Sequence, residues 1–164
     1  AARAPLRVGR LAAVDCASRL AMFLGGTMAE GWACYATDVM DECGFLTPAE
    51  RVSEQQTRVR MLARAIVDLE FHTGRRSFED AVSLYTDVVG MPAAAAHGEA
   101  VKNSMCPGTA VMYWLGTSQI HALRADEQRR LGGRFRLRDF HDRLLSFGAI
   151  PVALIARLLA SSPG

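Results

Sequence analysis

The chain has 164 residues, of which 50% are hydrophobic, so it is long enough to bury a core without help from disulfides or a metal. Its 19 Lys and Arg residues against 17 Asp and Glu residues give a formal charge of +2, which is too small to indicate a nucleic acid or another strongly acidic partner. We therefore expect one globular domain over residues 1–164, with no nucleic-acid partner.

The four cysteines, at positions 16, 34, 43 and 106, are widely spaced and form no C-x-x-C pair, which favours buried, reduced thiols over a zinc ribbon or a redox motif. Reduced thiols are typical of a reducing compartment, so we expect a cytoplasmic protein, with export of a longer parent left open. The longest apolar run, AIPVALIARLLA, is interrupted by Arg157 and is too short to span a membrane. We therefore expect a soluble protein with no membrane partner.

The first residues, AARAPLRVGRL, contain neither an initiator methionine nor the uninterrupted apolar segment and cleavage site of a secretion signal. We therefore expect the chain to be a C-terminal fragment of a longer protein. Apolar residues at helical spacing predict a first helix over residues 6–24, followed by a left-handed cap at Gly25 and Gly26.

Helix-start and helix-stop residues divide the rest of the chain into further helices. Thr47, Pro48 and Glu50 match a capping box with proline at the first helical position, which predicts a long helix that ends at Gly74. The other predicted helices cover residues 27–44, 77–90, 92–103, 107–132 and 138–147, and a last one begins at Pro151. No run alternates apolar and polar residues between hairpin turns. The sequence therefore predicts an all-α fold, a bundle of about seven or eight helices.

Glu30, in the stretch GTMAEGWACYATDVM, has two interpretations. With Thr27 it matches a capping box, in which both side chains satisfy backbone N–H groups of the first helical turn. A helical projection places it on the polar face, with Cys34 among others; the apolar face holds Met28, Trp32, Tyr35, Ala36, Val39, Met40 and Cys43. Gly31 favours the second interpretation, a ligand-binding role. Glycine inside a helix costs about 1 kcal/mol relative to alanine, so it is expected where another group approaches the backbone closely.

Asp68 and His72 are four residues apart near the end of the long helix. The carboxylate can therefore accept the N–H of the imidazole and determine which ring nitrogen stays free. Such a pair suits a metal ligand, a proton carrier or a donor to an oxyanion. The alternative is a surface pair in which His72 interacts with the C-terminal dipole of the helix.

Tyr113 lies in CPGTAVMYWLG, about one helical turn before Gly116 and on nearly the same face. A tyrosine hydroxyl beside a glycine gap can donate to a developing negative charge. The alternative is an amphipathic core residue whose hydroxyl lies at the edge of the core.

The remaining polar side chains give weaker signals. His97, His121 and His141 have no carboxylate or histidine at a convincing ligand spacing, so we interpret them as surface or core residues. We interpret the arginines between residues 129 and 138 as a solvated face rather than a site for single-stranded nucleic acid. The sequence also lacks H-E-x-x-H, G-x-S-x-G, a phosphate-binding glycine loop and a dinucleotide fingerprint, so it contains no complete active-site motif.

Four stretches, AEGWACYATDVM, VDLEFHTGRRSFEDAV, PGTAVMYWLG and FRLRDFHDRLLSFGAIPVALI, resemble the C-terminal half of a bacterial family in this order and at similar spacing. The family is the domain of unknown function family 885, whose members are helical and similar to zinc metallopeptidases of the gluzincin type. The resemblance covers nearly the whole chain. It implies that the chain is the C-terminal half of a larger, metallopeptidase-like helical fold.

The resemblance also implies roles for five residues. Glu30, in E-G-W-A, corresponds to the third zinc ligand of the family, with Trp32 packed beside it. His72, in H-T-G-R, and Tyr113, in P-G-x-A-x-x-Y-x-x-G, would line the substrate cleft and stabilise the oxyanion that forms when zinc-bound water attacks a peptide carbonyl. Asp68 would orient His72.

One part of the family pattern is absent. A catalytic zinc usually has three protein ligands, but no histidine precedes His72, so the family's H-E-x-x-P-G-H-H helix upstream of Glu30 has no counterpart here. Either the chain is truncated or the site has degenerated, and we expect truncation. The chain would then supply one zinc ligand and a cleft wall to a hydrolase of peptides or related amides, and would be inactive without its missing N-terminal half. The alternative is a non-catalytic helical binding or scaffold module.

Overall fold

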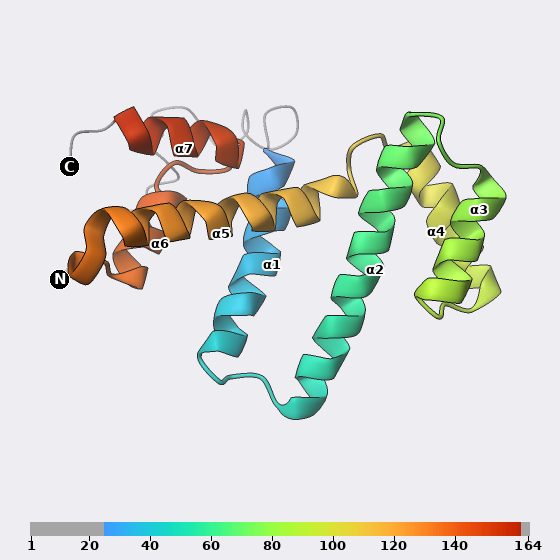
Figure 1. The fold of residues 1–164 in the computed structure, drawn as a ribbon, viewed down its shortest axis with the longest axis horizontal. Helices are drawn as coiled ribbons and strands as arrows, with labels where there is room; N and C mark the ends of the chain where they lie inside the picture. The colour runs from blue at the N-terminus through green and yellow to red at the C-terminus, as the bar shows by residue number, and fades with distance from the viewer. Residues whose placement is uncertain (1–24, 162–164) are drawn as a thin grey trace, which may run out of the picture. The chain divides into compact units, whose positions relative to one another are not determined.

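The computed structural model describes residues 25–161, which are helical apart from short connections (Figure 1). In chain order the helices are α1 (Gly26–Glu42), α2 (Pro48–His72), α3 (Phe78–Ser83), the π-helix η2 (Leu84–Val88), α4 (Ala93–Met105), α5 (Val111–Leu131), the 3-10 helix η3 (Gly132–Arg134), α6 (Leu137–Leu145) and α7 (Val152–Ser161). These residues contain no strand, so the predicted all-α fold is confirmed. The helix expected over residues 6–24 lies outside the described residues, as does Cys16.

Most helices begin and end close to the helix-start and helix-stop residues identified in the sequence. At the start of α2 the Thr47 hydroxyl accepts the backbone N–H of Glu50, and the Glu50 carboxylate accepts the backbone N–H of Thr47, so the predicted capping box is confirmed. Gly44 and Gly74, which follow α1 and α2, have φ angles of 71° and 68°. Only glycine adopts this left-handed conformation without a steric penalty, which is why the helices end there.

The chain divides into two compact units. The central unit is Ala33–Leu115, and the terminal unit combines the described residues up to Trp32 with those from Gly116 onward. Helices α1 and α5 each contribute residues to both units. Within residues 25–161, no helix is both long enough and apolar enough to cross a membrane.

Small side chains form much of the core of the central unit, where α3, η2 and α4 pack against the C-terminal part of α2 (Figure 1). The buried cluster consists of Ala63, Val67, Ala81, Tyr85, Ala96 and Ala100. Its four alanines allow the helix backbones to approach closely, and the ring of Tyr85 fills the space that remains. Phe71 and Phe78 cover the cluster, with parallel rings whose centroids lie 6.4 Å apart.

In the terminal unit, the start of α1 is bonded to the segment that leads into α7. The N–H of Gly25 donates to the carbonyl of Ala149 at 2.6 Å, and the N–H of Val152 donates to the Thr27 hydroxyl at 3.3 Å. Because α1 already begins at Gly26, Thr27 lies inside the helix and does not cap it. The predicted capping box between Thr27 and Glu30 is therefore wrong.

The predicted faces of α1 need a second correction. Cys34, placed on the polar face, is buried, because its thiol packs 3.8 Å from the sulfur of Met61 on α2. Met40 and Cys43, placed on the apolar face, are exposed. Cys106 is also exposed, so the expectation of buried thiols is correct for Cys34 alone among the three described cysteines.

Candidate functional site

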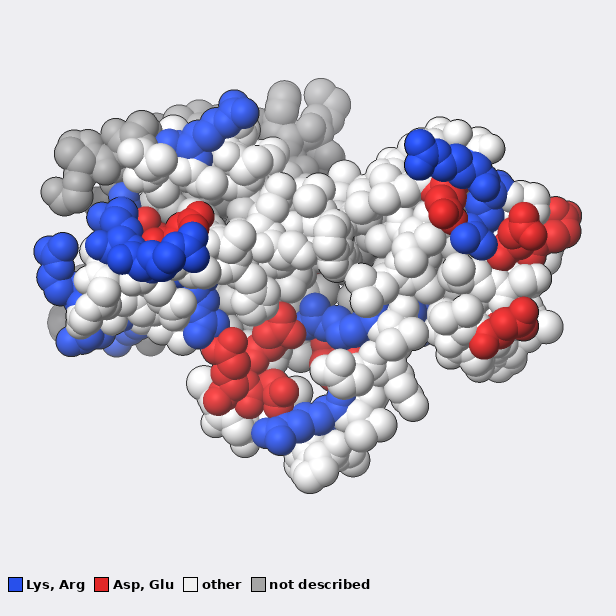
Figure 2. All heavy atoms as spheres, in the orientation of Figure 1, with Lys and Arg blue, Asp and Glu red and all other residues white. Residues whose placement is uncertain are grey.

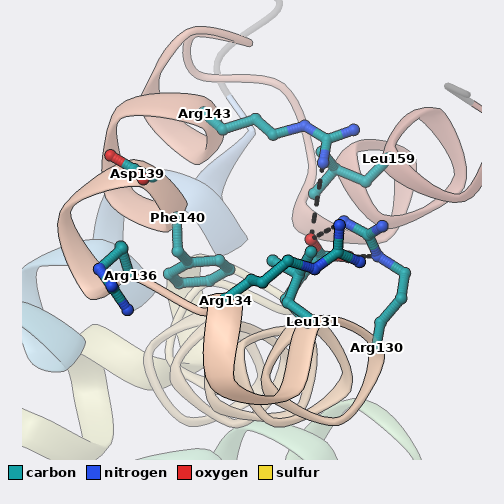
Figure 3. A pocket seen from close by; sticks show the side chains of 9 residues that line it. Arg130, Leu131, Arg134, Arg136, Asp139, Phe140, Arg143 and Leu159 are labelled. Atoms are coloured by element: carbon teal, nitrogen blue, oxygen red, sulfur yellow. Dashed lines mark hydrogen bonds and ion pairs between the residues drawn. The ribbon is translucent and has the colours of Figure 1, made fainter. Parts of the chain in front are cut away.

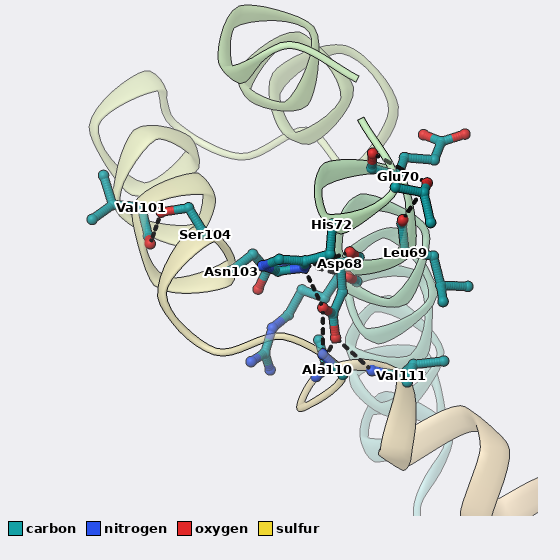
Figure 4. Close-up of polar contacts among 12 residues, drawn as sticks. Asp68, Leu69, Glu70, His72, Val101, Asn103, Ser104, Ala110 and Val111 are labelled. Atoms are coloured by element: carbon teal, nitrogen blue, oxygen red, sulfur yellow. Dashed lines mark hydrogen bonds and ion pairs between the residues drawn. The ribbon is translucent and has the colours of Figure 1, made fainter. Parts of the chain in front are cut away.

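Asp68 is a buried carboxylate on α2 whose side chain is directed at the turn between α4 and α5 (Figure 4). Its Oδ1 accepts the N–H of Gly108 at 2.8 Å, and its Oδ2 accepts the N–H groups of Ala110 at 2.8 Å and Val111 at 3.2 Å. Charge-assisted bonds of this kind are stronger than bonds between neutral groups. The carboxylate therefore determines where α5 starts, which is at Val111 and not at Pro107 as the sequence predicted.

His72 completes the pair that the sequence indicated. Its Nδ1 lies 3.0 Å from Asp68 Oδ1 and 2.8 Å from the backbone oxygen of Asp68. A carbonyl and an ionised carboxylate only accept hydrogen bonds, so Nδ1 carries a proton. The neutral imidazole then has its lone pair on Nε2, which makes no hydrogen bond to the described residues. The interpretation as a simple surface pair is wrong, because Asp68 is only 1% exposed.

Tyr113 lies in the same unit, and its ring faces the guanidinium group of Arg64. The Arg64 guanidinium carbon is 5.6 Å from the centroid of the Tyr113 ring, and Arg64 also forms an ion pair with Glu99 at 3.0 Å. A cation over an aromatic face is an attractive arrangement that gains strength as water is excluded, and the Arg64 side chain is only 14% exposed. The Arg64 guanidinium therefore contacts both Tyr113 and Glu99.

Two residues of this network, Arg64 and Asn103, were missed by the sequence analysis. The amide of Asn103 donates to the backbone oxygen of Arg64 at 2.9 Å and to the Tyr85 hydroxyl at 2.8 Å. Its position gave a usable signal, because Asn103 follows Ala96 and Ala100 at helical spacing and so lies on the buried face of α4. No comparable signal marked Arg64, whose partners come from other helices.

Glu30 and Trp32 belong to the terminal unit, whereas Asp68, His72 and Tyr113 belong to the central unit. Glu30 is partly exposed on α1. Trp32 packs edge-on against His141, with ring centroids 5.5 Å apart and an angle of 87° between the ring planes. The predicted site residues therefore fall into two groups, one in each unit.

A zinc site needs several ligands close together. Among residues 25–161, no three His, Cys, Asp or Glu side chains lie close enough to hold a metal ion. Glu30 thus has no set of companion ligands in the described part of the chain. These residues do not fit a zinc ion by themselves.

Gly31 has the close neighbour that the sequence predicted, but this neighbour is a helix. A Cβ atom on Gly31 would lie 2.4 Å from the carbonyl carbon of Gly116 on α5, and Thr117 Oγ1 is 3.4 Å from the Gly31 oxygen. The backbone of α1 also fills the space at Gly116, where a Cβ atom would lie 1.9 Å from the Thr27 oxygen. The expectation of an open gap at Gly116 beside Tyr113 is therefore wrong.

Two solved structures are similar to this chain. One is described as a "putative lipoprotein of unknown function" from Shewanella oneidensis, with a TM-score of 0.76, 28% identity, and coverage of 84% of this chain and 26% of that one. The other is described as a "putative lipoprotein" from Colwellia psychrerythraea, with a TM-score of 0.77, 31% identity, and coverage of 82% of this chain and 23% of that one. The chain thus spans about a quarter of the length of these proteins.

A comparison with curated proteins finds no match. The model of one family does match, over residues 9–159, and its description is bacterial protein of unknown function (DUF885). That range includes both groups of predicted site residues. The chain therefore belongs to the DUF885 family of bacterial proteins.

Proposed function

We propose that this chain is part of a zinc-dependent, peptidase-like hydrolase, to which it contributes one metal ligand and a wall of the substrate cleft. The observation that supports this best is the fixed orientation of His72 by the buried Asp68 carboxylate. An imidazole with Nδ1 committed to a carboxylate has a defined Nε2, which can accept a proton or, when the ring is protonated, donate to an oxyanion. The side chain of His72 is 27% exposed, so the imidazole is not sealed inside the core.

In this proposal each group has a separate task. Glu30 is the ligand that this chain supplies, and its failure to cap α1 leaves its carboxylate available for that role. The remaining ligands come from a part of the protein outside residues 25–161. His72 and the Tyr113 hydroxyl donate to the oxygen of a peptide or related amide as negative charge develops on it. Asp68 and Arg64 are positioning residues, which hold His72 and Tyr113 in place.

An exposed apolar stripe on α2 supports the proposal that further protein packs against this chain. Val52, Val59, Leu62, Ile66 and Leu69 are spaced seven, three, four and three residues apart along one helix, and each is between 44% and 60% exposed. We call these residues the α2 stripe. A contiguous apolar face of this kind usually marks an interaction surface. The missing N-terminal half of the hydrolase is the occupant we propose.

The two similar structures bear on location. Both are described as lipoproteins, a class of protein that is anchored to a membrane by lipid. We therefore propose an exported parent protein instead of the cytoplasmic one expected from the cysteines. Fractionation of cells that express the longer protein tests this, because recovery in the cytoplasmic fraction contradicts export.

The test of function uses the longer protein encoded around this chain. Zinc content measured by elemental analysis should approach one ion per molecule, and Glu30→Gln should remove both zinc and peptide hydrolysis. Glu79→Gln is the matched control, since Glu79 is an exposed carboxylate in the first turn of α3 and is not among the proposed site residues. His72→Ala should retain zinc and lower kcat. A zinc content unaffected by Glu30→Gln would contradict the assigned ligand.

A non-catalytic helical binding or scaffold module is the second candidate. This candidate is supported by two motif residues whose observed roles are structural. Gly31 allows the close contact between α1 and α5, and Asp68 accepts hydrogen bonds from backbone N–H groups at the start of α5. This candidate predicts that purified longer protein lacks zinc and does not hydrolyse peptides. Activity measurements on the wild-type protein and on His72→Ala therefore separate the two functions.

A further inference from the structure

The structure adds to the interpretation of the arginines between residues 129 and 138 as a solvated face. Several of them line a pocket of about 310 Å³ in the terminal unit (Figure 3). Its charged lining is Glu127, Arg130, Arg134, Arg136, Asp139 and Arg143, and its apolar lining is Leu131, Phe140 and Leu159. The residues come from α5, η3, α6 and α7. A volume of this size suits a small molecule.

Arginine side chains outnumber carboxylates in the lining of this pocket. Four guanidinium groups face two carboxylates, so the lining carries two more positive than negative charges. Figure 2 shows basic side chains gathered on this face around a small acidic patch. In Figure 3, Arg130, Arg134 and Arg143 point toward the same region, whereas Arg136 lies on the other side of the Phe140 ring. The excess charge is therefore concentrated at one end of the pocket.

Glu127 holds two of these arginines in place. It accepts Arg130 Nε at 2.9 Å and Arg130 Nη2 at 2.7 Å, and Arg143 Nη1 lies 3.5 Å from the same carboxylate. The hydrogen bonds from Arg130 lower the pKa of Glu127, so this carboxylate stays ionised at neutral pH. Because both guanidinium groups are already oriented, less conformational entropy is lost when they bind an anion.

Arg134 supplies a cation without a partner of its own. Its guanidinium forms no ion pair with any carboxylate among residues 25–161, and neither does that of Arg136, which donates only to the carbonyls of Gly133 and Phe135. Placing like charges near one another is unfavourable without a counter-ion. One carboxylate, Glu127, cannot neutralise three converging guanidinium groups, so this end of the pocket keeps an excess of two positive charges.

We propose that this pocket binds a small phosphate monoester whose organic part is apolar. A phosphate monoester carries a charge of about −1.5 to −2 near neutral pH and offers three acceptor oxygens, which matches the excess charge and the converging guanidinium forks. A carboxylate carries one charge and two oxygens, and so matches less well. Leu131 and Phe140 provide the apolar contact beside the charged end. This inference does not depend on the proposed hydrolase function.

Titration calorimetry on the whole 164-residue chain tests the proposal, with phenyl phosphate as the probe. We expect saturable binding of one molecule per chain, and binding about tenfold weaker for Arg134→Gln. Arg138→Gln is the matched control, because it removes the same charge from a side chain that is 91% exposed and does not line the pocket. Unchanged unfolding midpoints will establish that both variants fold. This is expected because Arg134 makes no ion pair within residues 25–161 and the ion pair of Arg138 with Asp142 is exposed.

Other probes make the test sharper. Benzoate, with one negative charge, should bind about tenfold more weakly than phenyl phosphate. Inorganic phosphate should also bind more weakly, because it lacks the apolar part. The proposal is overturned if phenyl phosphate does not bind, if benzoate binds equally well, if inorganic phosphate binds as tightly, or if Arg134→Gln and Arg138→Gln weaken binding to the same extent.

Discussion

Gly31 of α1 and Gly116 of α5 meet backbone to backbone. A Cβ atom on Gly31 would lie 2.4 Å from the carbonyl carbon and 2.5 Å from the Cα atom of Gly116. These are main-chain atoms, which cannot rotate aside as the end of a flexible side chain can. The contact therefore requires glycine on both helices and determines how closely α1 and α5 approach in the terminal unit.

The first prediction concerns this contact. Gly31→Ala should lower the free energy of unfolding by about 2–3 kcal/mol, because the added methyl group forces the two backbones apart. Gly98→Ala is the matched control: Gly98 lies in α4 and has no atom within 4 Å of the added Cβ position. That change should raise stability by about 0.5–1 kcal/mol. Urea denaturation of both variants measures the difference, and equal effects would contradict the close contact.

The second prediction compares the contributions of Asp68 and His72 to stability. Asp68→Asn replaces one acceptor oxygen with an NH2 group that faces backbone N–H donors, so at least one buried donor loses its partner. We expect a loss of about 3 kcal/mol in the free energy of unfolding. His72→Ala should cost about 1 kcal/mol or less, because its imidazole is partly exposed and Asp68 is its only hydrogen-bond partner among the described residues. If urea denaturation showed the reverse order, the assignment of Asp68 as the anchor of α5 would be wrong.

Most of the fold could be predicted because its determinants are local. Thr47 and Glu50 are three residues apart, and the glycines that end α1 and α2 directly follow those helices. Such signals depend on backbone geometry that the sequence specifies without knowledge of the tertiary structure. The pairing of Asp68 with His72 was predictable for the same reason, since four residues bring two side chains together on one helix.

The parts that could not be predicted depend on contacts between distant residues. Asp68 bonds to Gly108, 40 residues further along the chain, and this contact moved the start of α5 from the position that Pro107 indicated. The contact between Thr27 and Val152 spans 125 residues and occupies the hydroxyl that the expected capping box with Glu30 would have used. Local patterns contain no information about which distant backbone groups will compete for a side chain.

The third prediction concerns the buried pair of Tyr85 and Asn103. Tyr85→Phe removes the acceptor for one amide N–H of Asn103, which is itself buried, and should cost about 1–3 kcal/mol. In an Asn103→Ala background the same change should cost much less, because no amide is then left without its partner. Urea denaturation of the two single variants and the double variant measures this coupling. Equal costs in both backgrounds would contradict the hydrogen bond.

The raised pKa of Tyr85 also predicts that the protein loses stability at alkaline pH. Burial raises the pKa of Tyr85 above the ordinary value of 10.0. A group whose pKa is raised by folding contributes stability that is fully present below its unfolded pKa and is lost as the pH rises above it. Stability should therefore fall as the pH increases beyond about 10, and Tyr85→Phe should reduce this dependence. Denaturation curves at several pH values between 8 and 11 test the slope.

The fourth prediction concerns acid and the capping box of α2. The backbone N–H and the hydroxyl of Thr47 lower the pKa of Glu50 from its ordinary value of 4.5. A lowered pKa means that the stabilising contribution is present above pH 4.5 and is lost as the pH falls through the folded value. Glu50→Gln should make stability less dependent on pH below 4.5 than it is in the unmodified chain, because the variant side chain carries no ionisable carboxyl group. A pH profile identical to that of the unmodified chain would contradict the role of Glu50.

The fifth prediction concerns the α2 stripe, against which we proposed that further protein packs. In the 164-residue chain alone, two copies should associate through their exposed apolar faces, because association removes apolar surface from water. Ile66→Glu with Leu69→Glu should weaken this association about tenfold or more in sedimentation velocity experiments, since each change would bury a carboxylate without a partner. Val88→Glu is the control, because Val88 is 69% exposed on η2 and is not part of the stripe. A chain that stays monomeric at every accessible concentration, or a control variant that dissociates it equally, would remove the reason to assign a partner to this face.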